Sequence, residues 1–278
     1  MKTSSLTGRI PTLSVDEVRA YLAEHDPGAY NLLDVRQPEE YAKGHLPGSQ
    51  LMPVGELHRR IDEIDRTRPT VVYCRSGVRS ANGVGVLLNA GFDEVWNMAG
   101  GMLGWEGKVA TGAPEAGMWW FEKARGPEEN IALAWILEEG ARLFYARMAD
   151  QLASLGAGDL FKGLAAAEEG HKETVRKLYG VLTGREGDPL SPDEVAAHDT
   201  MEGGVSITKA LAWADGKKPV DVLEFSVAME VNAYDLYLKV AQELDDRESK
   251  DILLRIAREE KVHLDRLMEL FVRQAELS

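Results

Sequence analysis

The stretch Glu168-Glu169-Gly170-His171 recurs as Glu260-Lys261-Val262-His263, so a glutamate and a histidine three residues apart occur twice. Each copy follows a segment with a glutamate and, seven residues later, a tyrosine: Glu138 and Tyr145 before the first copy, Glu230 and Tyr237 before the second. All four positions repeat with one offset of 92 residues. Carboxylates and imidazoles that recur in register are typical of a helical bundle that encloses a metal site.

Hydrophobic periodicity places these glutamates on inward helix faces. Glu138 and its apolar neighbours follow one another at steps of three and four, and the other three segments place a glutamate in the same way. The stripe around Glu138 comprises Ile131, Ala134, Ala141, Tyr145, Met148 and Leu152. The pattern predicts an all-α four-helix bundle over residues 128–278, with Glu138, Glu168, Glu230 and Glu260 facing its interior.

Four carboxylates in an apolar core need cations, because an unpaired buried charge is very costly. The four stripes contain no lysine or arginine that could form buried ion pairs. Two divalent cations would balance the charge, and His171 and His263 would be neutral ligands because each shares a helix face with a glutamate. Tyr145 and Tyr237 would either donate hydrogen bonds to the ligands or simply pack in the core.

A long connection, at about residues 183–219, separates the second predicted helix from the third. Such a crossover lets the third helix run parallel to the second. It could instead exchange helix pairs between two subunits, and we expect a homodimer.

The length and composition of the chain limit its possible domain number, partners and location. At 278 residues the chain is long for one core, and two domains are expected. The net charge of −14 disfavours nucleic acid and anionic membranes as partners, and no stretch has the roughly 18 consecutive apolar residues of a membrane helix. The single cysteine, Cys74, excludes an intrachain disulfide and a cysteine-based metal site. A reducing cytoplasm is the expected location.

The first third of the chain alternates short apolar runs with helical patterns. Residues 30–35 and 70–74 read as buried strands, and residues 15–22 and 80–88 as helices. This order predicts an α/β domain with a mostly parallel sheet and flanking helices over residues 1–112. Glycine, proline and alanine then predict a linker at residues 113–127.

The second predicted strand leads into the loop Cys74-Arg75-Ser76-Gly77-Val78-Arg79-Ser80. Gly77 permits a tight turn, and a helix that begins near Ser80 points its free amides toward the loop. These amides, with Arg75 and Arg79, are expected to lower the pKa of Cys74. The resulting thiolate suits attack on a sulfane sulfur and storage of an anionic persulfide. The alternative is a structural cysteine at a strand end.

Residues 10–112 resemble the rhodanese family of sulfurtransferases. The matching stretches are residues 34–41, residues 44–49, the Cys74 loop, and residues 91–105 with Gly100-Gly101 and Trp105. The resemblance implies that Cys74 carries the persulfide and that Arg75 and Arg79 hold an anionic donor such as thiosulfate. The backbone of Ser76, Gly77 and Val78 would cradle the transferred sulfur. Four residues separate Cys74 from Arg79, as in sulfurtransferases; the loop of the family's phosphatase relatives is one residue longer.

Residues 118–275 resemble the ferritin-like, rubrerythrin-type di-iron proteins. The resemblance implies two iron ions, with manganese as the alternative metal. Glu138 and Glu230 would be terminal ligands, Glu168 and Glu260 would bridge, and His171 and His263 would each cap one ion. Rubrerythrins carry an additional glutamate where this chain has Ala233, and their Cys-x-x-Cys rubredoxin module is missing here. The electrons must therefore come from an external donor.

Together these patterns predict a sulfurtransferase that carries sulfur on Cys74, coupled to a di-iron centre for redox chemistry on peroxide, oxygen or sulfur species. Its expected partners are small sulfur-containing anions or thiols and the external electron donor. The alternative is a protein that senses persulfides and binds or stores iron without turnover at the metal site.

Overall fold

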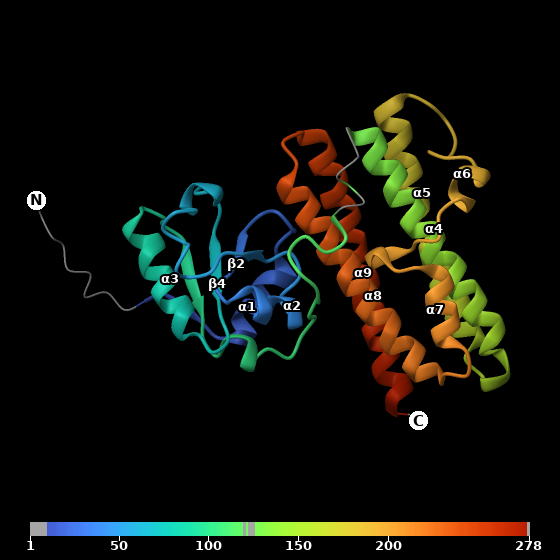
Figure 1. Cartoon of the computed structure of the whole chain (residues 1–278), viewed down its shortest axis with the longest axis horizontal. Helices are drawn as coiled ribbons and strands as arrows, with labels where there is room; N and C mark the ends of the chain where they lie inside the picture. The colour runs from blue at the N-terminus through green and yellow to red at the C-terminus, as the bar shows by residue number, and fades with distance from the viewer. Residues whose placement is uncertain (1–9, 119–120, 122–125, 277–278) are drawn as a thin grey trace, which may run out of the picture. The chain divides into compact units, whose positions relative to one another are not determined.

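The computed structural model describes residues 10–118, 121 and 126–276. The chain divides into two compact units, Met1–Pro114 and Glu115–Ser278, which are described separately below. Of the linker predicted at residues 113–127, positions 119–120 and 122–125 lie outside the described residues. Figure 1 shows the mixed α/β unit in blue to green and the helical unit in green to red.

The first unit is built on a five-stranded parallel sheet with the strand order β1-β5-β4-β2-β3. The strands are β1 (Thr12–Leu13), β2 (Asn31–Asp34), β3 (Gln50–Leu51), β4 (Thr70–Tyr73) and β5 (Val95–Met98). In the centre of the sheet, Leu33 pairs with Val72 and Asp34 pairs with Tyr73. The prediction of an α/β domain with a parallel sheet is therefore confirmed.

Helices cover both faces of this sheet because successive strand residues point to opposite sides. The α-helices are α1 (Val15–Glu24), α2 (Pro38–Lys43) and α3 (Val78–Asn89), with 3-10 turns η1 (Ile61–Glu63) and η2 (Gly101–Leu103). Leu33 and Val72 pack with Val84 of α3 in one core. Their neighbours Leu32 and Val71 pack with Val18 of α1 in another.

The second unit is a bundle of four long helices (Figure 1). They are α4 (Pro127–Gln151), α5 (Gly158–Thr183), α8 (Pro219–Glu243) and α9 (Arg247–Glu276), with the turn η4 (Ala153–Leu155) between the first two. Helix α4 packs on α5, α8 packs on α9, and α9 also contacts α4 and α5. Proline in the first turn of α4 and α8 and the left-handed Gly184 after α5 mark the helix ends. The predicted four-helix bundle is confirmed.

The crossover between α5 and α8 contains α6 (Pro192–Ala196), the turn η5 (Glu202–Gly204) and α7 (Ile207–Ala214). The turn η5 contacts α4 and α8, and α7 contacts α4. Gly140 on α4 makes this approach possible, because a Cβ there would overlap the Thr200 carbonyl oxygen and lie 2.7 Å from the Met201 Cα. The crossover is therefore packed into the groove between two bundle helices.

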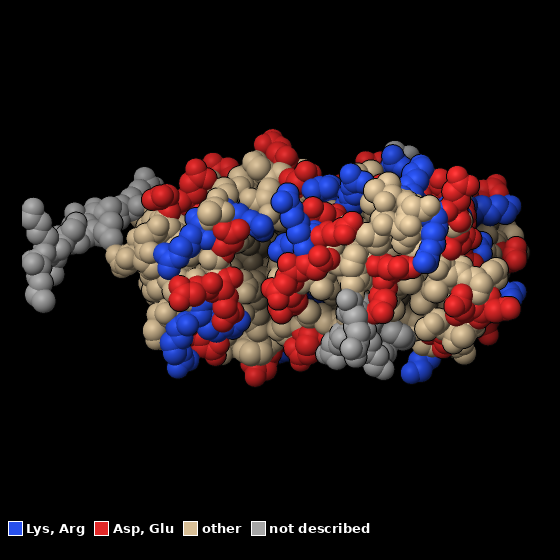
Figure 2. Space-filling model, turned by 90° about the horizontal axis from the view of Figure 1, so that it is seen from above, with Lys and Arg blue, Asp and Glu red and all other residues tan. Residues whose placement is uncertain are grey.

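No helix in the described part of the chain is long and apolar enough to cross a membrane. On the face that Figure 2 shows, acidic and basic side chains are interspersed, and the whole chain carries a net charge of −14.

Candidate thiol site and candidate metal centre

Cys74 lies directly after β4, where the chain turns into α3. Its side chain is buried, and its Sγ accepts a hydrogen bond from the Gly77 amide at 3.2 Å. The turn η2 holds the loop from outside, because the amides of Met102 and Leu103 donate to the carbonyls of Cys74 and Arg75 at 2.9 and 3.0 Å. Gly77 begins the helix at a φ of +92°, a conformation that favours glycine. The sulfur is thus held in a fixed backbone cradle.

The pKa of the Cys74 thiol is lowered from its ordinary value of 9.0. Burial raises it, but hydrogen bonds from the Ser80 hydroxyl and from the backbone amides of Ser80, Ser76 and Gly77 outweigh burial. The Ser80 hydroxyl has a single hydrogen to donate. Its oxygen lies 2.6 Å from the Asn97 Oδ1 but 3.4 Å from the Cys74 Sγ. We therefore regard the amides as the steadier donors.

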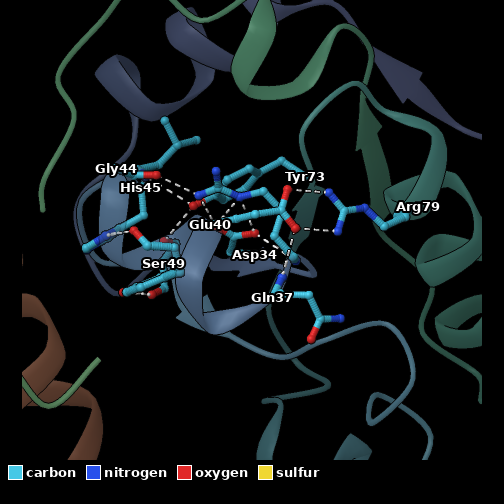
Figure 3. A network of polar contacts seen from close by, with 11 residues as sticks. Asp34, Gln37, Glu40, Gly44, His45, Ser49, Tyr73 and Arg79 are labelled. Carbon is cyan, nitrogen blue, oxygen red and sulfur yellow. Dashed lines mark hydrogen bonds and ion pairs between the residues drawn. The ribbon is translucent and has the colours of Figure 1, made fainter. Parts of the chain in front are cut away.

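The two arginines of the loop have different surroundings. Arg79 forms a bidentate pair with Glu40, with both N–O distances at 2.7 Å (Figure 3). This hydrogen bonding to Arg79 lowers the pKa of Glu40 to about 2. Arg75 is exposed and forms no ion pair with any described residue. Arg75 can meet an incoming anion directly, whereas Arg79 must share its charge with Glu40.

Behind the loop, a polar network fixes the strand ends (Figure 3). Arg36 binds both carboxylate oxygens of the fully buried Asp34 and donates to the Gly44 carbonyl at 2.7 Å. The Tyr73 hydroxyl lies 2.8 Å from the Ser49 Oγ. These contacts tie the ends of β2 and β4 to residues 44–49 between α2 and β3, which is a structural role.

The bundle brings the six predicted ligands together. His171 on α5 places its Nδ1 3.2 Å from the Glu138 Oε2, 3.2 Å from the Glu168 Oε2 and 3.1 Å from the Glu260 Oε1. His263 on α9 places its Nδ1 3.5 Å from the Glu168 Oε1 and 3.7 Å from the Glu230 Oε2. Four helices therefore contribute to one cluster in which each imidazole lies among carboxylates.

A seventh residue, Glu202 of η5, also belongs to this cluster. Ligand atoms of Glu138, His171, Glu202 and Glu260 lie within 4.8 Å of one another, as do those of Glu168, Glu202 and Glu230. Sequence reasoning missed Glu202 because it lies in an aperiodic connection. The only available signal was Glu202-Gly203-Gly204, an acidic residue before two glycines.

The cluster is buried, and much of its hydrogen-bonding capacity is unused. Glu138, Glu168, Glu202, Glu230 and Glu260 are 0% exposed. Both carboxylate oxygens of Glu202 and both ring nitrogens of His263 lack a hydrogen-bond partner among the described residues. The same holds for Glu168 and Glu260, whose close contacts with the His171 Nδ1 do not have hydrogen-bond geometry. Orphaned buried carboxylates of this kind are rare without a bound ion.

Burial and mutual repulsion dominate the electrostatics of the cluster. Burial raises the pKa values of Glu168 and Glu202 well above the usual range of a glutamate. It raises the pKa of Glu260 to about 8. Burial lowers the pKa of His263; burial also opposes protonation of His171, but the surrounding carboxylates raise the pKa of that ring. Lys172 gives no relief, because its Nζ binds Glu139 at 2.6 Å and Glu169 at 3.3 Å.

Two tyrosines support the carboxylates across the bundle. The Tyr145 hydroxyl of α4 donates to the Glu230 Oε1 of α8 at 2.5 Å. The Tyr237 hydroxyl of α8 donates to the Glu138 Oε1 of α4 at 3.2 Å. Each helix thus supplies a glutamate to the cluster and a tyrosine to the glutamate of the other helix.

The donor set fits iron. Carboxylate oxygens suit hard divalent and trivalent cations, and imidazole nitrogens suit iron. The only cysteine, which could have favoured a softer metal, belongs to the other unit. Cations at this position would satisfy the orphaned oxygens, which no described side chain does.

Known families match both parts of the chain. Residues 14–108 match the family model described as Rhodanese-like domain, and residues 129–214 and 221–276 match the one described as Rubrerythrin. The second match comprises segments of 86 and 56 residues, 142 of the chain's 278.

Individual relatives match shorter parts. A sulfurtransferase of Allochromatium vinosum is 38% identical over 74 residues, 27% of this chain and 69% of that protein. The thiosulfate sulfurtransferase GlpE of Pseudoalteromonas translucida is 31% identical over 75 residues, 27% of this chain and 71% of that protein. The crystal structure of a rhodanese-like domain protein from Staphylococcus aureus is 29% identical, with a TM-score of 0.34, and covers 37% of this chain and 100% of that one.

Proposed function

Because the chain belongs to the rubrerythrin family and also carries a rhodanese-like domain, we propose that it is a two-site enzyme of sulfane-sulfur and redox metabolism. Cys74 transfers sulfur, and the bundle holds two iron ions, with manganese as the alternative metal. One observation carries the metal half: a fully buried set of carboxylates and imidazoles with orphaned oxygens. The lowered pKa of Cys74 in its amide cradle supports the sulfur half.

The sulfur step starts with the Cys74 thiolate. It attacks the outer sulfur of thiosulfate or of a thiol persulfide; a new S–S bond to Cys74 forms, the old S–S bond breaks, and sulfite or a thiolate leaves with the electron pair. Arg75 attracts the anionic donor, and the amides of Ser76 and Gly77 stabilise the negative charge on the sulfur that Cys74 then holds. An acceptor thiolate or cyanide removes this sulfur and releases the Cys74 thiolate.

In the bundle, four glutamates and two histidines would hold the metal ions: Glu138, Glu168, Glu230, Glu260, His171 and His263. When bound, the ions supply one-electron redox chemistry toward peroxide, oxygen or a sulfur species. The apolar walls exclude water, and Tyr145 and Tyr237 keep the carboxylates of Glu230 and Glu138 in place by donating a hydrogen bond to each.

Partners and location follow from the chemistry. Small sulfur-containing anions or thiols serve the first site, and an external donor reduces the second because the chain has a single cysteine and no Cys-x-x-Cys module. Cys74 must remain a free thiol to function, which favours the reducing cytoplasm. A homodimer is part of this proposal.

Three measurements test the two halves. Thiosulfate:cyanide sulfur transfer should depend on Cys74 and vanish in Cys74→Ser; full activity in that variant would refute the sulfur half. Metal analysis should find about two irons per chain, by the charge argument for a dinuclear site, and the reduced protein's absorption should change when peroxide is added. A chain that holds iron but is never reoxidised by peroxide or oxygen would instead be a binding or storage protein.

A further inference from the structure

Among the described residues, the carboxylate of Glu202 is a buried charged group to which the sequence pattern assigns no role. It is 0% exposed, and neither oxygen has a hydrogen-bond partner among the described residues. A buried carboxylate with no partner is costly as an anion, so it must be balanced by a cation, be protonated or reduce the stability of the fold. The two buried lysines of the bundle do not relieve it, because Lys172 binds Glu139 and Glu169 and Lys239 binds Asp235.

The backbone conformation of residues 201–205 determines where Glu202 lies. Gly203 and Gly204 have φ values of +64° and +72°, and the Met201 amide donates to the Val205 carbonyl at 2.9 Å. These features close a tight loop from residue 201 to residue 205, with Glu202 next to its tip. Left-handed glycines at two consecutive positions let the loop turn without a side-chain clash. The loop therefore fixes the position of the Glu202 backbone.

Two bundle helices hold the loop against the cluster. A Cβ on Gly203 would lie 3.3 Å from the Met229 carbonyl oxygen of α8, and Gly140 of α4 leaves space for Met201. On α8, the position one turn beyond Glu230 is the buried Ala233, so that turn adds no second carboxylate. The crossover adds one in its place.

We propose that Glu202 is a metal ligand contributed by the crossover and shared by both halves of the dinuclear centre. This inference rests on the proposed function of the bundle. Its basis is that an oxygen of Glu202 lies within 4.8 Å of ligand atoms of Glu138, His171 and Glu260, and also of ligand atoms of Glu168 and Glu230. Glu202 thus belongs to two of the candidate ligand groups in the cluster.

A fifth carboxylate changes the charge balance of the site. Two ferrous ions neutralise four carboxylates and leave the fifth uncompensated, whereas two ferric ions bring two further positive charges. Glu202 therefore stabilises the oxidised state relative to the reduced one and lowers the reduction potential. It also couples metal binding to the crossover, because ions bound to Glu202 hold this segment more tightly than its packing on α4 and α8 alone.

The test compares Glu202→Gln with wild type in the full chain. Glutamine has the same shape without the charge, and Glu224→Gln, an exposed change on α8, is the matched control. We expect Glu202→Gln to lose iron to a chelator more readily, with about a tenfold loss of affinity, and to show a higher reduction midpoint in a redox titration. The control should match wild type in both measurements.

The outcomes separate the two proposals. If wild type itself holds no iron or manganese after reconstitution, the proposed function of the bundle fails and this inference fails with it. If wild type binds iron but Glu202→Gln has the same affinity and midpoint potential, only the role of Glu202 is overturned.

A second measurement does not depend on a variant that folds. Hydrogen–deuterium exchange of wild-type protein should slow in residues 201–205 when Mn²⁺ is added, because the ions then anchor the loop. Unchanged exchange in this segment, alongside Mn²⁺ binding by the protein, would overturn the assignment.

Discussion

The thiol site and the metal centre are built in opposite ways. The Cys74 site uses a short contiguous loop whose own amides surround the sulfur, and its main donors lie within six residues of Cys74. The metal centre gathers side chains from α4, α5, η5, α8 and α9 and leaves several oxygens without partners. In the thiol site, the protein itself supplies the hydrogen bonds to the sulfur. In the metal centre, the unpartnered carboxylate oxygens are satisfied only when cations bind. Variants and metal removal test this contrast.

Replacing Cys74 by serine should abolish sulfur transfer, with a loss of roughly a thousandfold or more in rate, as for other single nucleophiles. The assay is thiosulfate:cyanide transfer. Iron content should stay at the wild-type value because the cluster lies in the other unit. A parallel loss of iron would show that the two sites are not independent.

Removing the metal should destabilise the bundle and leave the first unit unchanged. Binding at a thousandfold excess over Kd stabilises a protein by about 4 kcal/mol, which for a unit of this size corresponds to about 10 °C in Tm. Scanning calorimetry with and without a chelator measures the shift. Equal shifts of two transitions, or no shift, would contradict the contrast between the sites.

Removing the Tyr145 hydroxyl should weaken metal binding. Tyr145→Phe leaves the Glu230 oxygen without its 2.5 Å hydrogen bond, and the loss of such an outer partner typically costs about tenfold or more in affinity. Tyr237→Phe should cost less, because its hydrogen bond to Glu138 is longer, at 3.2 Å. Calorimetric titration with Mn²⁺ measures both. Tyr179→Phe, a tyrosine of α5 whose hydroxyl lies 3.5 Å from Glu128, is the control.

Releasing Arg79 from Glu40 should improve binding of the sulfur donor. In Glu40→Gln the guanidinium no longer shares its charge with a carboxylate, and the KM for thiosulfate should fall by about two- to fivefold, the scale of a partly exposed ion pair. Steady-state kinetics give the value, with the exposed neighbour substitution Glu39→Gln as control. A higher KM would mean that Glu40 positions Arg79 rather than competing for it.

The pH dependence of Cys74 reports on its cradle. Because its pKa is lowered from 9.0, the thiolate persists to lower pH than in a free thiol, and the iodoacetamide alkylation rate should rise with a midpoint below 9.0. Ser80→Ala should raise that midpoint because the sulfur loses a hydrogen bond, but only slightly, since the hydroxyl hydrogen is shared with Asn97. Ser76→Ala keeps its amide and should not move it.

Local patterns were enough to predict much of the molecule. The 92-residue repeat and its apolar stripes predicted the bundle, because a helix face is set by residues three and four positions apart. The same rule explains why Glu138, Glu168, Glu230 and Glu260 are all buried, as their stripes imply. The strand and loop pattern around Cys74 likewise predicted the parallel sheet, since βαβ order leaves few alternatives.

Only the tertiary structure decided how distant segments complete the sites. The pairing of Arg79 with Glu40 joins α3 to α2. Tyr145 and Tyr237 each donate a hydrogen bond to a glutamate of the other's helix rather than its own. Glu202 enters the cluster from a connection without periodicity, held by the space that Gly140 leaves on α4. Periodicity describes one helix at a time, so the sequence by itself determined which residues face inward. Which of them meet, and what the crossover adds to them, depends on packing between elements.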